Sequence, residues 1–246
     1  PPLSTAGKSL LLAPALLPAL VAAQERYNIV YIMTDDHTAQ MMSCYDKTHV
    51  STPNLDRIAA DGVKFVNSYV ANSLSGPSRA CMLTGKHSHK NGFTHNEHGI
   101  FDGSQQTMPK LLQKAGYQTA IVGKWHLVSL PTGFDYWNIV PEQGDYYNPD
   151  FITMANDTVR ESGYITTDKA IDWLDHKRDK NRPFALFIHH KACHRCWLPE
   201  LKYLNEYEDK TFTKPSTFND DYAGRAAAQA QEMRIASNHD MDLVYD

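Results

Sequence analysis

The stretch PFALFIHHKACH, residues 183–194, indicates the fold because an apolar run passes directly into polar side chains. Residues 183–190 are expected to form a buried strand. Two more apolar runs, at 27–34 and at 118–123, each predict a strand. The strand at 27–34 is also expected to be buried. The polar residues that follow the three strands are Asp35, Asp36 and His37, then Lys124, Trp125 and His126, and finally Lys191, Cys193 and His194. Ligands of open α/β sheets bind at the carboxyl ends of strands, so this placement predicts a functional site.

Helical segments alternate with the expected strands. Residues 52–62 predict a helix with Thr52 as N-cap, Pro53 in the first turn and Gly62 at the end. The other expected elements are a strand at 63–70, a helix at 108–117 stopped by Gly116, a helix at 165–179 with Ala170, Ile171 and Leu174 on one face, and a long helix at 220–245. This alternation predicts an α/β fold, in which helices flank a mostly parallel sheet.

The composition excludes several classes of protein. The chain has 24 Lys and Arg against 28 Asp and Glu, a net charge of −4, which argues against a nucleic-acid-binding protein that neutralises phosphates. With 42% apolar residues, 246 residues can bury a sizeable core. The uneven spacing of Cys44, Cys81, Cys193 and Cys196 predicts no disulfide framework.

Residues 8–24, KSLLLAPALLPALVAAQ, have the pattern of a secretory signal: a lysine, an apolar run and small residues. The run is shorter than the roughly 20 residues that a spanning helix needs, and two prolines interrupt it. We expect a leader at 1–24, a mature chain from near Gln24, no membrane span, and a periplasmic or secreted domain at 25–246. A non-native leader is the alternative for residues 1–7.

The polar clusters at the strand ends combine residue types that suit ester hydrolysis. Paired carboxylates such as Asp35 and Asp36 provide hard oxygen ligands for Ca²⁺ or Mg²⁺. Lysines and histidines opposite them suit a substrate anion and proton transfer. Each cluster alone is compatible with a helix cap or a solvated turn. Their shared position favours a site for displacement at a phosphate or sulfate ester.

The stretch SGPSRACMLTG, from Ser75 to Gly85, adds a candidate nucleophile. Pro77 and Ser78 are expected to open a helix whose amino terminus attracts an anion. Arg79, one turn into that helix, can bind oxygens in a bidentate way. Ser75 or Ser78 is the nucleophile in this interpretation, and the stretch has neither a GxSxG elbow nor a Walker glycine pattern.

The same stretch resembles the signature of the formylglycine-dependent sulfatases, which reads Cys or Ser, any residue, Pro, Ser, Arg, four residues, Thr and Gly. The matching positions are Ser75, Pro77, Ser78, Arg79, Thr84 and Gly85. The acidic pair and three further motifs follow the family's order within 27–246: TPNLDRIAADGVKF at 52–65, GKWHL at 123–127 and HKACHRCW at 190–197. The resemblance implies an alkaline-phosphatase-like fold.

The resemblance also implies a cofactor and a metal. A serine-type maturing enzyme would oxidise Ser75 to formylglycine, whose hydrated form is a geminal diol. One oxygen of the diol attacks sulfur, and the other later expels sulfate as the aldehyde reforms. Asp35 and Asp36 would bind Ca²⁺, with the modified Ser75 as a further ligand.

The remaining polar side chains receive roles from the same resemblance. Arg79, Lys124 and His126 would hold and polarise the diol. Lys191 would help to bind the sulfate, and His194 would protonate the leaving alcohol. The partner implied by these roles is a sulfated glycan substrate.

The chain departs from the family pattern in two places. The family completes its metal site downstream in an Asp-x-Gly type turn, and Asp240 and Asp242 in the expected tail helix are poor substitutes. We therefore expect the chain to lack the C-terminal subdomain, with the rest of its gene product as a partner. Cys193 and Cys196 form a CxxC pair where relatives usually lack one, which leaves zinc binding, redox chemistry and simple sequence variation as interpretations.

Residues 87–103 and 131–151 resemble the bacterial N-acetylglucosamine-6-sulfatases of glycosaminoglycan-degrading gut bacteria. The substrate implied is the 6-O-sulfate of N-acetylglucosamine in heparan-type or mucin glycans. Trp137, Tyr146 and Tyr147 either stack on sugars or belong to the core. The alternatives are a sulfatase of another sulfated sugar, a phosphomonoesterase or phosphonate hydrolase of the same superfamily, and an inactive fragment that binds calcium or glycans.

Overall fold

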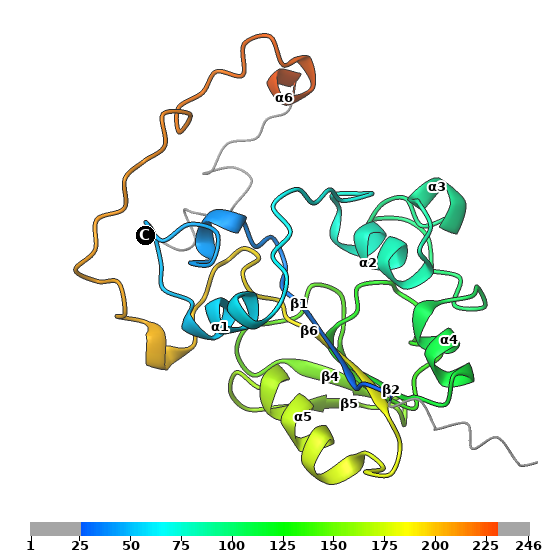
Figure 1. Ribbon diagram of the computed structural model, residues 1–246. Coiled ribbons are helices and arrows are strands. Elements are labelled where there is room, and N and C mark those ends of the chain that lie inside the picture. The colour runs from blue at the N-terminus through cyan, green and yellow to red at the C-terminus, as the bar shows by residue number, and fades with distance from the viewer. Residues whose placement is uncertain (1–25, 231–246) are drawn as a thin grey trace, which may run out of the picture.

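The computed structural model describes residues 26–230, which form a six-stranded sheet flanked by helices (Figure 1). The strands are β1 (Ile29–Met33), β2 (Gln118–Lys124), β3 (Tyr136–Val140), β4 (Asp150–Thr153), β5 (Thr158–Arg160) and β6 (Phe184–His189). Their order in the sheet is β1-β6-β2-β3-β4-β5. The first four strands of this order are parallel, and β4 and β5 add an antiparallel hairpin. The predicted mostly parallel sheet is confirmed.

The register places the ends of three strands side by side. His189, the last residue of β6, pairs with Met33 of β1 on one side and with Gly123 of β2 on the other. The loops after these three strands therefore leave the sheet side by side, at the carboxyl ends of the strands. The three polar clusters expected from the sequence lie together at this end of the sheet.

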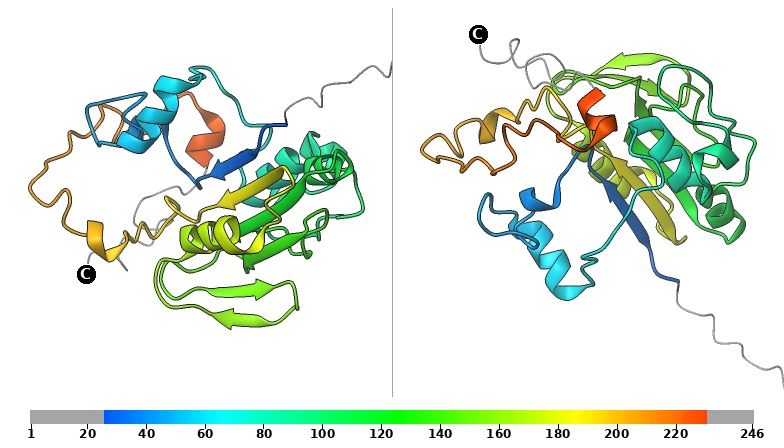
Figure 2. Two further views of the ribbon diagram at one scale, coloured as in Figure 1. Left: turned by 60° about the horizontal axis from the view of Figure 1, so that its bottom comes forward. Right: turned by 90° about the horizontal axis from the view of Figure 1, so that it is seen from above.

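Helices cover both faces of the sheet, with α2 and α4 on one face and α5 on the other (Figures 1 and 2). The helices are α1 (Pro53–Asp61), α2 (Ser75–Thr84), α3 (Ser88–Asn91), α4 (Met108–Lys114), α5 (Thr166–Asp172) and α6 (Ala226–Ala230). A π-helical turn, Trp173–Lys177, continues α5, and short 3₁₀ turns occur at Ala39–Met41 and Leu201–Tyr203.

Alternate side chains of the central strands form two buried clusters, one on each face. Ile121 of β2 and Phe187 of β6 belong to the cluster that contains Leu83 of α2. Val122 and Leu186 belong to the cluster that contains Trp173. Because β2 and β6 are covered on both faces, β6 is apolar at every position before His189, and β2 has a continuous apolar stretch from Ala120 to Val122 rather than an alternating pattern.

Two expected helices are confirmed with small differences at their ends. α1 ends at Asp61, with Gly62 after it as predicted. Thr52 stands at the N-cap position of α1, but its hydroxyl bonds to Ser43 Oγ and to the Asp56 carboxylate and caps no backbone N–H of the helix. α4 ends at Lys114, and Gly116 follows in the left-handed region with φ 88°.

Two expectations about strands are wrong. β1 is a strand but is not buried: among residues 26–230 it is an edge strand paired with β6 alone, and Val30 is 50% exposed. Residues 63–70 form no strand, and Val63 and Phe65 are exposed. Their apolar character alone did not suffice, because a strand also needs a partner for its backbone groups.

Two expectations about helices are also wrong. Ile171 is exposed, because the buried stripe of α5 runs through Ala170 to Trp173, and Ile171 lies about 100° around the helix from Ala170. Residues 220–225 are not helical, and α6 begins at Ala226. The rest of the expected tail helix and the leader expected at 1–24 lie outside the described residues. Within 26–230, no helix is long and apolar enough to cross a membrane.

Candidate active site

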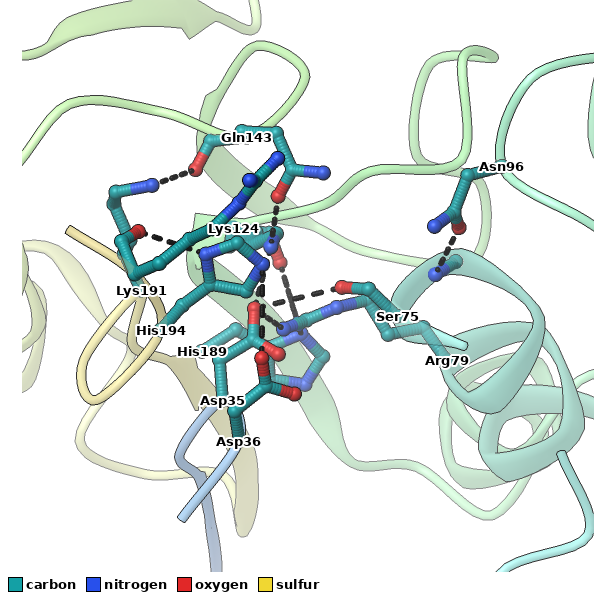
Figure 3. Close-up of polar contacts among 12 residues, drawn as sticks. Asp35, Asp36, Ser75, Arg79, Asn96, Lys124, Gln143, His189, Lys191 and His194 are labelled. Carbon is teal, nitrogen blue, oxygen red and sulfur yellow. Dashed lines mark hydrogen bonds and ion pairs between the residues drawn. The ribbon is translucent and has the colours of Figure 1, made fainter. Parts of the chain in front are cut away.

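The carboxylate of Asp35 is the centre of the site at the edge of the sheet. Its Oδ2 accepts a hydrogen bond from Lys124 Nζ, lies 3.3 Å from Arg79 Nη2, and lies 3.4 Å from Ser75 Oγ (Figure 3). Asp35 follows β1, Lys124 ends β2, and Ser75 and Arg79 belong to α2. The fold thus brings together four residues predicted from three separate motifs.

Burial and ion pairing shift the pKa values of this group. Burial alone raises the pKa of Asp35, but the charges of Lys124 and Arg79 together outweigh it and hold that pKa below its ordinary value. The side chain of Lys124 is 0% exposed, and this burial lowers its pKa to about 8 although Asp35 opposes the shift. Two cations around one buried carboxylate leave net positive charge beside Ser75, which suits an anionic substrate.

The helix that carries Ser75 begins two residues earlier than predicted. Ser75 is the first residue of α2, and Ser78 N donates to Leu74 O across 2.8 Å in the first turn. Gly76 N donates to Asn96 Oδ1 across 2.9 Å. A Cβ on Gly76 would lie 2.8 Å from His126 O and 2.8 Å from a ring carbon of Phe93. Glycine is therefore needed for α2 to pack this closely behind the candidate nucleophile.

Arg79 is more enclosed than a side chain that clamps a substrate. It is 2% exposed, and its Nη1 donates to Lys124 O across 2.9 Å and contacts His189 Nδ1 at 3.0 Å, while Nη2 faces Asp35. Its Nε is buried without a hydrogen-bond partner among the described residues. The guanidinium nitrogens expected to bind ligand oxygens thus contact protein groups. Arg79 holds the Asp35 carboxylate through Nη2 and the end of β2 through Nη1.

Two backbone hydrogen bonds hold the loop after β6 against the loop after β1. Asp35 N donates to Ala192 O at 2.8 Å, and Cys193 N donates to Asp35 O at 2.7 Å. His194 Nδ1 donates to Arg195 O at 2.8 Å, which leaves Nε2 facing Asp36 Oδ2 at 3.7 Å. The loop therefore places His194 Nε2 at the mouth of the site.

Gln143 contacts both lysines of the site. Its Oε1 accepts from Lys124 Nζ at 2.6 Å, and its backbone O accepts from Lys191 Nζ at 3.3 Å. Lys191 Nζ also lies 5.2 Å from the centre of the Tyr146 ring. Burial lowers the pKa of Lys191, against the opposing charge of Asp35. Tyr146 donates from its hydroxyl to His194 O, so it also supports the loop.

His126 lies in a strained part of the chain. Its φ is 53°, a left-handed value that a residue with a Cβ rarely adopts. Burial, together with the charges of Lys124 and Arg79, lowers the pKa of His126 to about 4. Its Nδ1 is buried without a partner among the described residues. The imidazole is therefore neutral at pH 7, and its Nδ1 is closed to solvent.

Two cavities meet the site. One has a volume of about 430 Å³ and is lined by Asp35, Asp36, Ser75 and Arg79 among others. The other, of about 550 Å³, is lined by His126 and Gln143 together with Asn96, Trp125 and Glu142 among others. The candidate nucleophile Ser75 and the acidic pair therefore line one cavity, and His126 lines the other.

The donor atoms of the site suit a hard cation but are few. The carboxylates of Asp35 and Asp36 and the oxygen of Ser75 are oxygen donors, the type that Ca²⁺ prefers, and Asp36 is exposed. Ca²⁺ takes about six to eight such ligands. Within 26–230, no group of three or more His, Cys, Asp and Glu is arranged to hold a metal ion. The acidic pair thus fits as part of a calcium site that needs further oxygens.

The cysteines and aromatic residues singled out in the sequence lie around the site. Cys193 is exposed, Cys196 is half-buried, and both thiols are free. Trp137 is buried in the cluster beneath α2, which favours the core interpretation for this residue. Tyr146 is buried and Tyr147 is half-buried, and their hydroxyls donate to His194 O and Pro199 O.

Sequence reasoning missed Asn96, Gln143 and His189. Asn96 and Gln143 lie in the two segments, 87–103 and 131–151, that we related to the N-acetylglucosamine-6-sulfatases, but neither residue was singled out. His189 had a usable signal, since a histidine that ends an otherwise apolar strand next to a polar cluster is expected at the site edge. The contacts of Asn96 and Gln143 can be seen only in the folded structure.

The chain belongs to the sulfatase family, since the Sulfatase family model matches residues 27–244. It is 54% identical to the N-acetylglucosamine-6-O-sulfatase of Bacteroides thetaiotaomicron over 89% of this chain and 40% of that protein. It is 30% identical to the human N-acetylgalactosamine-6-sulfatase over 86% of this chain and 48% of that protein.

A solved structure shares the fold. The structure of BT4656 in complex with its substrate D-glucosamine-2-N,6-O-disulfate matches with a TM-score of 0.82 and 54% identity, over 87% of this chain and 44% of that one. The alkaline-phosphatase-like sulfatase fold expected from the signature is thereby confirmed. The chain spans less than half the length of these relatives.

Proposed function

We propose that the protein carrying this chain is a sulfuric-ester hydrolase that removes the 6-O-sulfate from N-acetylglucosamine in heparan- or heparin-type glycosaminoglycans or in mucin glycans. The observation that carries the proposal is the 54% identity to an N-acetylglucosamine-6-O-sulfatase. The contacts of Ser75, Arg79 and Lys124 with Asp35 support it. A periplasmic or secreted location follows from the leader expected at 1–24.

The proposal includes formylglycine at Ser75, made by a serine-type maturing enzyme, and Ca²⁺ beside Asp35 and Asp36. The hydrated aldehyde supplies two oxygens on one carbon, and Ca²⁺ neutralises the charge of an anionic ligand. Ser75 Oγ is 3.4 Å from Asp35 Oδ2, so the modified side chain and the carboxylate can share one cation. The remaining ligands of Ca²⁺ come from outside the described residues.

The residues of this chain would bind the sulfate group and move one proton. The half-buried Lys191 attracts the sulfate oxygens, and the ammonium group of Lys124, buried beside Asp35, adds positive charge to the site. His194 Nε2 is the atom that delivers a proton to the leaving alcohol, because Nδ1 is engaged with Arg195 O. His126, neutral at pH 7, orients the reacting group without adding charge.

The test is a panel of substrates given to the full-length protein after coexpression with a serine-type maturing enzyme. The panel contains N-acetylglucosamine-6-sulfate, N-acetylgalactosamine-6-sulfate and N-acetylglucosamine-6-phosphate. We expect turnover of the first and little of the others. Mass mapping of the Ser75 peptide should show the loss of two hydrogens that conversion to formylglycine causes.

The variant Ser75→Ala is the control for the nucleophile, because it should abolish sulfate release and preserve sugar binding. Turnover by this variant would exclude the formylglycine mechanism. Preference for the galactosamine or phosphate ester would replace the proposed substrate by one of the alternatives. Sugar or calcium binding without turnover by a protein with modified Ser75 would favour the inactive binding protein.

A further inference from the structure

His189 is a buried histidine that the reaction outlined above does not use. It ends β6, is 1% exposed, and lies directly beneath two residues of the site (Figure 3). Its Nδ1 is 3.0 Å from Arg79 Nη1 and 3.1 Å from Lys124 O. Arg79 Nη1 also donates to Lys124 O at 2.9 Å, so the three groups form a closed triangle.

The partners of Nδ1 determine where the proton of the imidazole lies. A guanidinium group only donates hydrogen bonds, so a hydrogen bond between Nδ1 and Arg79 Nη1 requires the lone pair of Nδ1 as the acceptor. A proton on Nδ1 would instead be donated to Lys124 O at 3.1 Å, and it would leave two donors, Nδ1 and Nη1, 3.0 Å apart. The neutral tautomer with its hydrogen on Nε2 avoids this contact of two donors, because Arg79 Nη1 then donates to both Nδ1 and Lys124 O.

The surroundings of the ring keep it neutral but give an Nε2 hydrogen no conventional acceptor. Nε2 has no hydrogen-bond partner among the described residues, and the ring lies edge-on to Tyr31 and Phe187, with centroids 6.0 Å and 6.4 Å away. An N–H near aromatic rings makes a weak favourable contact. Burial and the nearby Arg79 charge lower the pKa of His189 to about 3, which keeps the ring neutral.

We infer that His189 is a positioning residue for Arg79: as a neutral Nε2–H tautomer it accepts from Nη1 and thereby aims Nη2 at Asp35. The inference rests on the proposed function, because it makes the alignment of Asp35 with Ser75 depend on a residue that touches no substrate. Arg79 has four rotatable side-chain bonds before its planar group, and the hydrogen bonds from Nη1 fix the plane of that group.

Three variants separate the hydrogen bond from packing. His189→Asn keeps an acceptor near the Nδ1 position, whereas His189→Leu fills the space without one. Leu186→Ala is the matched control, because Leu186 is fully buried on the same strand and belongs to the cluster on the opposite face. All three variants should lower the midpoint of unfolding. Only His189→Asn tests whether a hydrogen-bond acceptor at this position restores activity.

We expect His189→Leu to lose about 10–100-fold in kcat on N-acetylglucosamine-6-sulfate, the range seen when a residue that orients a functional group is removed. His189→Asn should recover most of this loss, and Leu186→Ala should retain kcat at a temperature where it is folded. Equal activity of His189→Leu and wild type would overturn the inference. So would an equal loss in His189→Asn and His189→Leu at matched unfolding midpoints.

A second measurement does not depend on activity. Two-bond ¹H–¹⁵N correlations of wild-type protein labelled at histidine report the tautomer of His189, assigned by its absence from His189→Leu. We expect a protonated Nε2 and a bare Nδ1 between about pH 5 and 8, the range in which ordinary histidines titrate. A protonated Nδ1 would overturn the inference. If wild type hydrolyses no sulfate, the proposed function fails, and this spectrum still decides the role of His189.

Discussion

The candidate site has two halves that differ in burial. Asp35, Arg79, Lys124 and His189, the buried half, are each at most 6% exposed and are joined by hydrogen bonds. Asp36, Lys191 and His194, the open half, lie on loops and are half-buried or exposed. In the buried half each group depends on the others for its charge state. The open half is left free to meet a ligand.

The largest expected difference between the halves concerns their two aspartates. Asp35→Asn removes the charge that compensates two buried cations, and we expect a loss of about 3–5 kcal/mol in the free energy of unfolding. Asp36→Asn removes an exposed carboxylate that faces His194 Nε2 at 3.7 Å, and it should cost about 0–1 kcal/mol. Denaturant unfolding of both variants without added Ca²⁺ checks this. Similar losses in the free energy of unfolding for Asp35→Asn and Asp36→Asn would show that the groups of the buried half depend on one another no more than those of the open half do.

The second effect tests the packing behind Ser75, the candidate nucleophile. Gly76→Ala forces a methyl group against His126 O and Phe93, and overpacking of this kind costs about 1–3 kcal/mol. Gly85→Ala at the other end of α2 is the control, because no atom lies within 4 Å of the added methyl and only the left-handed φ of 65° is strained. Thermal unfolding should rank Gly76→Ala as the less stable variant. The reverse ranking would mean that α2 shifts without cost.

Much of the buried half could be predicted from the sequence. The apolar runs of β2 and β6 identify central strands, and the residues after such strands must meet at one sheet edge. Asp35 and Lys124 were found in this way. Arg79 was found through the signature, although its contacts with the protein interior were not foreseen.

The rest could not be predicted because it depends on contacts between distant segments. Gln143 lies in an irregular turn, and its meeting with Lys124 follows from the way β3 leaves the sheet. Residues 63–70 have the composition of a strand, but nothing in that composition states whether a neighbouring strand exists. The exposure of β1 is likewise a property of strand order and not of its own residues.

The third effect is a dependence of stability on pH. The pKa of His126 is about 4 in the folded chain, below the ordinary value of 6.5, so the unfolded state binds more protons between these values. The free energy of unfolding should therefore fall as the pH falls from about 6.5 to 4. His189 and His190, whose pKa values are also lowered by burial, contribute in the same direction.

The variant His126→Asn should flatten this pH dependence by on the order of 1–2 kcal/mol, allowing for the partial exposure of the ring. His176→Asn is the control, since the His176 side chain is 74% exposed on the π-helical turn. Denaturant unfolding at a series of pH values measures both slopes. An unchanged slope in His126→Asn would place His126 in contact with water, as part of the open half.

The smallest expected effect concerns Gln143, which joins the halves. Gln143→Leu removes the acceptor for Lys124 Nζ but keeps the backbone oxygen that accepts from Lys191. Because Gln143 is exposed, water can replace the lost acceptor, and we expect KM to rise about 2–10-fold, equivalent to roughly 0.5–1.5 kcal/mol, with kcat preserved. An unchanged KM would mean that Asp35 alone fixes Lys124 and that the buried half is independent of the open one. A large loss in kcat would instead place the Gln143 amide next to the reacting atoms.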